Sequence, residues 1–145
     1  MKGGTVLAKL TSLKPVGLLL VRAVMGAAMI AHGYPKLLNS APFLERFPQM
    51  GFPAWTVYVV GAVETFGGLL LILGLFTRFA AFFISGEMFI AFLQVHWKAA
   101  ERGVLGFLGS SRDEYPLLLA VVAFLLLTTG AGAFSLDRLL FRDKA

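Results

Sequence analysis

The stretch GAVETFGGLLLILGLFTR, residues 61–78, decides the fold of this chain. It belongs to an apolar segment from about residue 55 to residue 75, long enough for a membrane-spanning helix, which needs roughly 20 residues. Its one carboxylate, Glu64, lies three residues after Gly61 and three before Gly67, so all three share a helix face on which a neighbouring helix can approach closely. A charge at this depth costs at least ~2.5 kcal/mol. We therefore expect Glu64 to face protein or water rather than lipid.

The composition excludes an ordinary soluble domain. Of 145 residues, 58% are hydrophobic and 14% are charged, and the mean hydropathy is +0.81, so a soluble fold would expose too much apolar surface. The net charge of +5 is explained by basic residues at the ends of spans, not by nucleic-acid binding. The chain has no cysteine, which excludes thiol chemistry and Cys-ligated metal centres. We expect a single all-α, integral membrane domain over residues 1–145 that contacts the lipid bilayer and no nucleic acid.

Four apolar runs predict a four-helix bundle whose spans cover about residues 16–38, 55–75, 79–97 and 115–133. Short interfacial helices are expected in the loop of residues 39–54 and in the tail from Phe134, and the connector of residues 98–114 is expected to be either an irregular surface loop or a short interfacial helix. Pro116 is expected in the first turn of the fourth helix. Glu87 and His96 lie about 180° apart on an ideal helix. Either the third helix ends or bends before His96, or the two side chains face different surroundings.

The distribution of basic residues indicates the orientation of the chain. Seven lie at the N-terminus, after the second span and at the C-terminus: Lys2, Lys9, Lys14, Arg78, Arg138, Arg142 and Lys144. Five lie in the other two loops: Lys36, Arg46, Lys98, Arg102 and Arg112. Because basic residues concentrate on the cytoplasmic side, this bias predicts a multi-pass protein with both termini in the cytoplasm.

Polar residues within the spans form the candidate site. Around the first helix, Arg22 and Lys36 fall about 40° apart and His32 about 40° beyond Lys36, so they share one side. We expect these three to converge with Glu64 and His96 in the bundle interior. Glu64 is then either a structural ion-pair partner or a carboxylate that handles protons or orients a ligand. No metal site is predicted, because the Glu-x-x-His spacing of di-iron bundles is absent, and a haem would need a histidine deeper in the bundle.

Several short motifs together resemble the DoxX family of small bacterial membrane proteins with four spans. They occur in the family's order and cover nearly the whole chain: Arg22, HGYPK (32–36), ETFGG (64–68), GLFTR (74–78), His96, Tyr115-Pro116 and FSLD (134–137). The resemblance implies a four-helix bundle in the bacterial inner membrane that works with redox partner proteins. The family takes its name from a subunit of a terminal quinol oxidase that also acts as a thiosulfate:quinone oxidoreductase. Carried over by position, its polar signature is Arg22, His32, Lys36, Glu64, Arg78 and His96.

Two classes of function remain open. In the first, the chain is a subunit of a quinone-linked redox system with Glu64, His32 and His96 as catalytic residues, because a quinone needs hydrogen-bond donors and a nearby carboxylate to take protons. These three, with Arg22 and Lys36, would hold the quinone head group in a pocket where Gly33, Gly67 and Gly68 leave space. In the second, it is a non-catalytic module, such as a small-solute transporter, a channel or an assembly partner. Either class allows a homo-oligomer.

Overall fold

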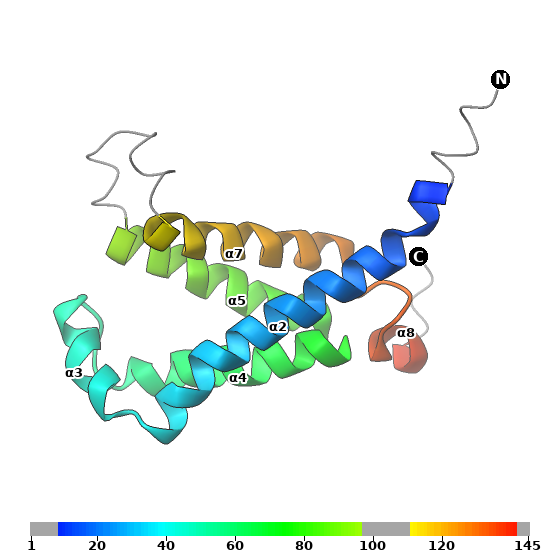
Figure 1. Ribbon diagram of the computed structural model, residues 1–145. Coiled ribbons are helices and arrows are strands. Elements are labelled where there is room, and N and C mark those ends of the chain that lie inside the picture. Colours follow the sequence, from blue (N-terminus) through cyan, green and yellow to red (C-terminus); the bar gives the residue numbers. More distant parts are fainter. Residues whose placement is uncertain (1–8, 97–110, 142–145) are drawn as a thin grey trace.

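Four long helices form a bundle. The computed structural model describes residues 9–96 and 111–141, and the side chains of residues 9–94 and 114–141. The bundle consists of α2 (Lys14–Leu38), α4 (Thr56–Leu73), α5 (Thr77–Ala91) and α7 (Ser111–Thr129) (Figure 1). Helix α2 packs mainly on α4, α5 packs mainly on α7, and contacts between α4 and α5 join the two pairs. The described residues contain no strand. The all-α bundle predicted from the sequence is confirmed.

The bundle is apolar on its outside as well as in its core. The core is built from Met25, Met29, Leu71, Ala81, Ile84, Met88, Ala123 and Leu126. Four phenylalanines on the outside of the bundle are each more than half exposed: Phe66, Phe79, Phe82 and Phe124. Helices α2 and α4 are each long and apolar enough to cross a membrane, and residues Glu114–Thr129 form a shorter apolar helix. Because helices satisfy their own backbone hydrogen bonds, this two-sided apolar bundle suits a bilayer.

Glycines let α2 and α4 pack closely. A Cβ atom added to Gly26 would lie 2.5 Å from the carbonyl oxygen of Gly68, and one added to Gly33 would lie 2.6 Å from the backbone nitrogen of Thr65. Such distances leave no room for a side chain, so backbone lies against backbone. On α2 the two contacts are seven residues apart, which keeps Gly26 and Gly33 on nearly the same face, and on α4 they fall at Gly68 and Thr65.

The two glycines beside Glu64 on its own helix serve different neighbours. Gly61 faces α2, because a Cβ atom there would lie 3.0 Å from the Cβ atom of Lys36. Gly67 faces α5, where its Cβ atom would lie 3.0 Å from Cδ1 of Ile84. The close approach of a helix predicted beside Glu64 is present at Gly61, but the single shared face is not, because Gly67 faces the Ile84 side chain of another helix.

The link between α4 and α5 is short and tightly bent. Gly74 ends α4 in the left-handed conformation with φ of 64°. Phe76 precedes α5 with φ of 48°, an unfavourable value for a side chain of this size. The final helix α8 (Leu136–Phe141) lies against this link, since the backbone N–H of Asp137 donates to the carbonyl oxygen of Gly74 at 2.8 Å.

The shorter elements bear on several expectations. Helix α3 (Ala41–Gln49) and helix α8 confirm the short helices predicted in the first loop and the tail. Helix α5 ends at Ala91 and a π-helix, η1 (Phe92–His96), follows, so the third helix changes its geometry before His96. Helix α7 begins at Ser111, which places Pro116 inside the helix and not in its first turn. The loop or short helix expected in residues 98–114 falls mostly on positions outside the described ones.

Candidate functional site

A buried ion pair joins α2 to α4. Nζ of Lys36 donates a hydrogen bond to Oε2 of Glu64, and only 8% of the surface of Lys36 and 4% of that of Glu64 is exposed. The same ammonium donates to the carbonyl oxygen of His32 at 2.8 Å and lies 5.8 Å from the centre of the Phe43 ring. Because Gly61 has no side chain, Lys36 lies close to α4 one turn from Glu64. The expected contact between Glu64 and a basic residue of the first helix is present.

A second carboxyl group, that of Glu87 on α5, lies beside this pair. Both of its side-chain oxygens are buried, and neither has a hydrogen-bond partner among the described residues. Glu87 is within electrostatic reach of Glu64 and Lys36, so two buried carboxyl groups lie near one lysine, which pairs with Glu64. The sequence places Glu87 inside an apolar span, which marks it as a candidate. The site predicted from the sequence does not include Glu87, whose position relative to Glu64 depends on how α5 packs on α4.

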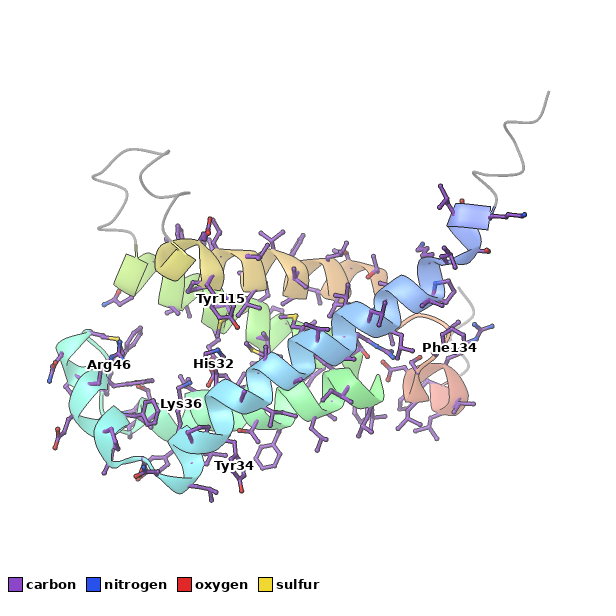
Figure 2. The ribbon with its side chains drawn as sticks, in the orientation of Figure 1. His32, Tyr34, Lys36, Arg46, Tyr115 and Phe134 are labelled. Carbon is purple, nitrogen blue, oxygen red and sulfur yellow. The ribbon has the colours of Figure 1, made fainter. Side chains whose placement is uncertain are left out.

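Two side chains with hydrogen-bonding groups lie at the same end of the bundle. Nε2 of His32 and the hydroxyl oxygen of Tyr115 are 3.3 Å apart, and the ring centres are 5.7 Å apart. Figure 2 shows Tyr115 on α7 pointing toward His32, with Lys36 one turn further along α2. Both rings are partly exposed, so they remain accessible to a ligand. In the sequence, Tyr115 stands out only as part of a family motif. No sequence feature near Tyr115 predicts its contact with His32, 83 positions earlier.

We call these five residues, His32, Lys36, Glu64, Glu87 and Tyr115, the Glu64 cluster. It combines an ammonium, a hydroxyl and an imidazole with two carboxyl groups, one of which has no partner. Such a set can donate hydrogen bonds to a polar head group and can accept or release protons. Among the described residues, no three His, Asp or Glu side chains lie where they could hold a metal ion.

Arg22 does not join this cluster, which corrects the prediction. Its guanidinium is fully buried at the other end of α2, where Nη1 donates to the carbonyl oxygen of Ala131 at 2.6 Å and Nη2 donates to that of Phe134. Arg22 and Lys36 do share one side of α2, but 14 residues of helix separate them by about 21 Å along the axis. Angular position on a helix says nothing about height, so a shared side of α2 does not bring Arg22 and Lys36 together.

The last motif of the chain packs against the link between α4 and α5. The carboxylate of Asp137 accepts hydrogen bonds from the backbone N–H groups of Phe76, at 2.6 Å, and Thr77, at 2.9 Å. It also attracts the guanidinium of Arg22 electrostatically. Gly74 also belongs to this contact. The Arg22 guanidinium and Ser135 occupy the space where a side chain at position 74 would lie. We call this set, Arg22, Gly74, Phe76, Thr77 and Asp137, the Arg22 junction.

Space beside Glu64 was expected at Gly33, Gly67 and Gly68, and this expectation is wrong. Neighbouring helices fill all three positions: a Cβ atom at Gly33 would lie 2.6 Å from Cβ of Glu64, and one at Gly68 would lie 2.6 Å from the carbonyl oxygen of Gly26. These glycines serve close helix packing. Two hollows occur elsewhere: one of about 940 Å³ at the Arg22 junction, and one of about 430 Å³ on the outer side of α5 and α7.

His96 was the remaining predicted site residue. Its backbone ends η1, but its side chain lies outside the described part of the chain, so its place in the cluster stays a prediction.

Comparison with known proteins places the chain in a family. The DoxX family model matches residues 17–97, which is more than half of the chain. CatD of Bacillus subtilis, whose name assigns it provisionally to the oxidoreductases, is 30% identical over 129 residues, covering 89% of this chain and 90% of its own. Inner membrane protein YqjF of Escherichia coli is 33% identical over 128 residues, covering 88% and 95%. An uncharacterised membrane protein of Mycobacterium tuberculosis is 32% identical over 140 residues, covering 86% and 81%. No solved structure gives a significant match. The family match and the relatives agree with the motifs: the chain is a membrane protein of the DoxX family.

Proposed function

We propose that this protein is a membrane subunit of a quinone-linked redox system and that its Glu64 cluster receives the quinone head group. The observation that carries the proposal is Glu87, whose two buried oxygens lack a partner in the part of the chain that the structure describes, beside the ion pair of Lys36 and Glu64. Burying a polar group without a partner is costly, and carboxyl groups inside membrane spans are functional by default. A proton or a ligand would complete this group. The provisional oxidoreductase name of CatD supports the same class of function.

Each member of the cluster has a role in this proposal. His32 and Tyr115, which are accessible, donate hydrogen bonds to a quinone oxygen, while Lys36 holds Glu64 in place. Conversion of a quinone to a quinol consumes two electrons and two protons. Glu64 and Glu87 are the groups that pass protons. The electrons come from a redox partner protein, because none of these side chains is a two-electron reductant. His96 remains a candidate second donor, and Arg22 has no part in the site.

The setting of the protein is part of the proposal. We infer four spans in the bacterial inner membrane with both termini in the cytoplasm, so that the Glu64 cluster lies toward the outer face. The bias in basic residues and the name of the Escherichia coli relative support this placement. A homo-oligomer is compatible with it.

The alternative is a non-catalytic membrane module. It is favoured by the mutual satisfaction of Lys36 and Glu64 and by the closed packing at Gly33. In that case the ion pair holds α2 on α4, and the cluster stabilises the fold or lines a pathway.

Binding of a short-chain quinone by purified protein in nanodiscs separates the two. We expect saturable binding by the wild type and about tenfold weaker binding by His32→Ala, because a lost hydrogen bond to a bound oxygen costs roughly 1–3 kcal/mol. Tyr115→Phe should also weaken binding. Tyr34→Phe is the matched control, since Tyr34 is exposed on the same helix as His32 and points away from it (Figure 2). Absence of quinone binding by the wild type favours the non-catalytic module, and equal affinity in all variants places the site elsewhere.

A further inference from the structure

A groove of about 940 Å³ with a mixed polar and apolar lining lies at the end of the bundle opposite the Glu64 cluster, where α5 begins and α7 ends (Figure 1). Its polar lining includes Thr77, Arg78, Ser135, Asp137 and Arg138. Its volume falls within the range of about 300–1,000 Å³ that is usual for ligand sites. The proposed quinone site does not use it.

The groove carries positive charge that the described residues do not neutralise. Arg78 and Arg138 are both exposed, and no carboxylate of the described residues lies within 4.0 Å of either guanidinium. Asp137 also lines the groove, but its two oxygens already accept hydrogen bonds from the backbone N–H groups of Phe76 and Thr77. Arg22 lies beneath the floor, where it donates to the carbonyl oxygen of Ala131. Two arginines therefore line the groove and a third lies beneath it, against one occupied carboxylate, a balance of charge that favours an anion.

Two further features indicate what kind of anion fits. Thr77 lines the groove, and its buried hydroxyl group has no hydrogen-bond partner within residues 9–96 and 111–141. The rim is aromatic: Phe76, Phe79 and Phe141 are each at least 52% exposed, and the rings of Phe76 and Phe141 are 5.4 Å apart. A free phosphate would use the arginines but not the phenylalanines. A molecule with an anionic head and apolar chains would use both.

We propose that this groove is a binding site for an anionic phospholipid. The phosphate of the head group lies between Arg78 and Arg138, and the acyl chains run outward over Phe76, Phe79 and Phe141 into the bilayer. Basic pockets between helices at the cytoplasmic side of membrane proteins are suited to anionic lipid head groups. A lipid bound there would tie α8 to the link between α4 and α5 and so reinforce the Arg22 junction.

The test is a lipid titration of delipidated protein in a neutral detergent, read by native mass spectrometry. The probes are phosphatidylglycerol and phosphatidylcholine of the same chain length, and inorganic phosphate. We expect at least tenfold tighter binding of phosphatidylglycerol than of phosphatidylcholine. Each of Arg78→Gln and Arg138→Gln should weaken phosphatidylglycerol binding about fivefold, and the double variant about 25-fold. Replacement of both arginines by lysine should retain most of the affinity, because it keeps the charge.

Arg46→Gln is the matched control, since Arg46 is an exposed arginine on α3 at the far end of the molecule (Figure 2). It should leave lipid affinity unchanged. Should Arg78→Gln prove unstable through its contact with Gly130, Arg138→Gln carries the test alone, because no hydrogen bond of its side chain is lost. Equal binding of the two lipids, or a loss in Arg46→Gln as large as in Arg78→Gln, would overturn the proposal. Displacement of the lipid by millimolar phosphate would also overturn it and identify a site for a free anion.

Discussion

The carboxylate of Asp137 caps α5 by accepting a hydrogen bond from the backbone N–H of Phe76, although the two residues are 61 positions apart. No side chain of the segment preceding α5 caps this helix. The first N–H groups of a helix have no acceptor inside the helix, and a carboxylate there also interacts favourably with the helix dipole. The last motif of the chain thus completes a helix that begins near its middle, and it holds Phe76 at a positive φ.

Loss of this cap should destabilise the protein. Asp137→Ala leaves the N–H groups of Phe76 and Thr77 without an acceptor, and replacement of a capping residue by alanine typically costs about 1 kcal/mol, within a range of about 0.5–2 kcal/mol. The effect should reach the upper end of that range, because Arg22 also loses its electrostatic partner. Thermal unfolding in detergent measures it. Glu45→Ala on the exposed side of α3 is the control; equal stability of the two variants would contradict the capping role.

Close packing of α2 on α4 can be tested with matched glycine substitutions within one helix. A Cβ atom at Gly26 would lie 2.5 Å from a backbone oxygen of α4, whereas one at Gly17 would meet nothing within 4 Å. Gly26→Ala should therefore lower the unfolding temperature by several degrees and force the helices apart. Gly17→Ala should be neutral or raise it, because alanine restricts the unfolded chain and favours helix. Tolerance of Gly26→Ala would mean that the helices are further apart than described.

Orientation in the membrane can be tested because the chain has no cysteine of its own. Ser12→Cys, on the exposed start of the first helical segment, and Glu45→Cys, on α3, lie at opposite ends of the bundle. A membrane-impermeant maleimide should label Glu45→Cys in intact cells and should label Ser12→Cys only after the cells are opened, since the bias in basic residues places the termini inside. Labelling of Ser12→Cys in intact cells would invert the proposed topology.

Much of the fold is predictable because it depends on local patterns. The length of the apolar runs predicted the number of long helices, whereas Pro116, expected in the first turn of the fourth helix, lies inside α7. Glycines on one face of α4 indicated a close neighbour. These patterns do not say which helix is the neighbour. Gly61 faces α2, while Gly67, six residues later, faces α5. The choice between neighbours is made by tertiary packing.

The site is less predictable for the same reason. The pairing of Glu64 with a basic residue followed from the cost of a buried charge, but three basic residues on one side of α2 were available. Only the crossing of α2 and α4 places Lys36, and not Arg22, at the height of Glu64. The partners of Arg22 are backbone carbonyls more than 100 residues away, and backbone acceptors leave no trace in a sequence.

Substitution of Lys36 and substitution of Glu64 should lower the stability of the protein by different amounts, and the second carboxyl group, that of Glu87, explains the difference. Lys36→Met leaves two buried carboxyl groups without a base, and removal of one partner from a buried pair typically costs 3–5 kcal/mol. Glu64→Gln should cost clearly less, because Glu87 is within electrostatic reach of Lys36 and can replace Glu64 as its partner. Glu87→Gln should be neutral or stabilising, since it removes an unpartnered carboxyl group. Unfolding in detergent by a denaturant series gives all three free energies.

The same three variants separate a structural cluster from a working one. If the cluster only holds α2 on α4, quinone turnover with a redox partner should follow stability, and Glu87→Gln should be as active as the wild type. If Glu87 passes protons, Glu87→Gln should lose most of its turnover while its fold is intact and its quinone affinity is nearly unchanged, because glutamine keeps the shape but cannot exchange a proton. Equal destabilisation by Lys36→Met and Glu64→Gln would show that Glu87 does not share the lysine. The proposal that Glu87 passes protons would then lose its structural basis.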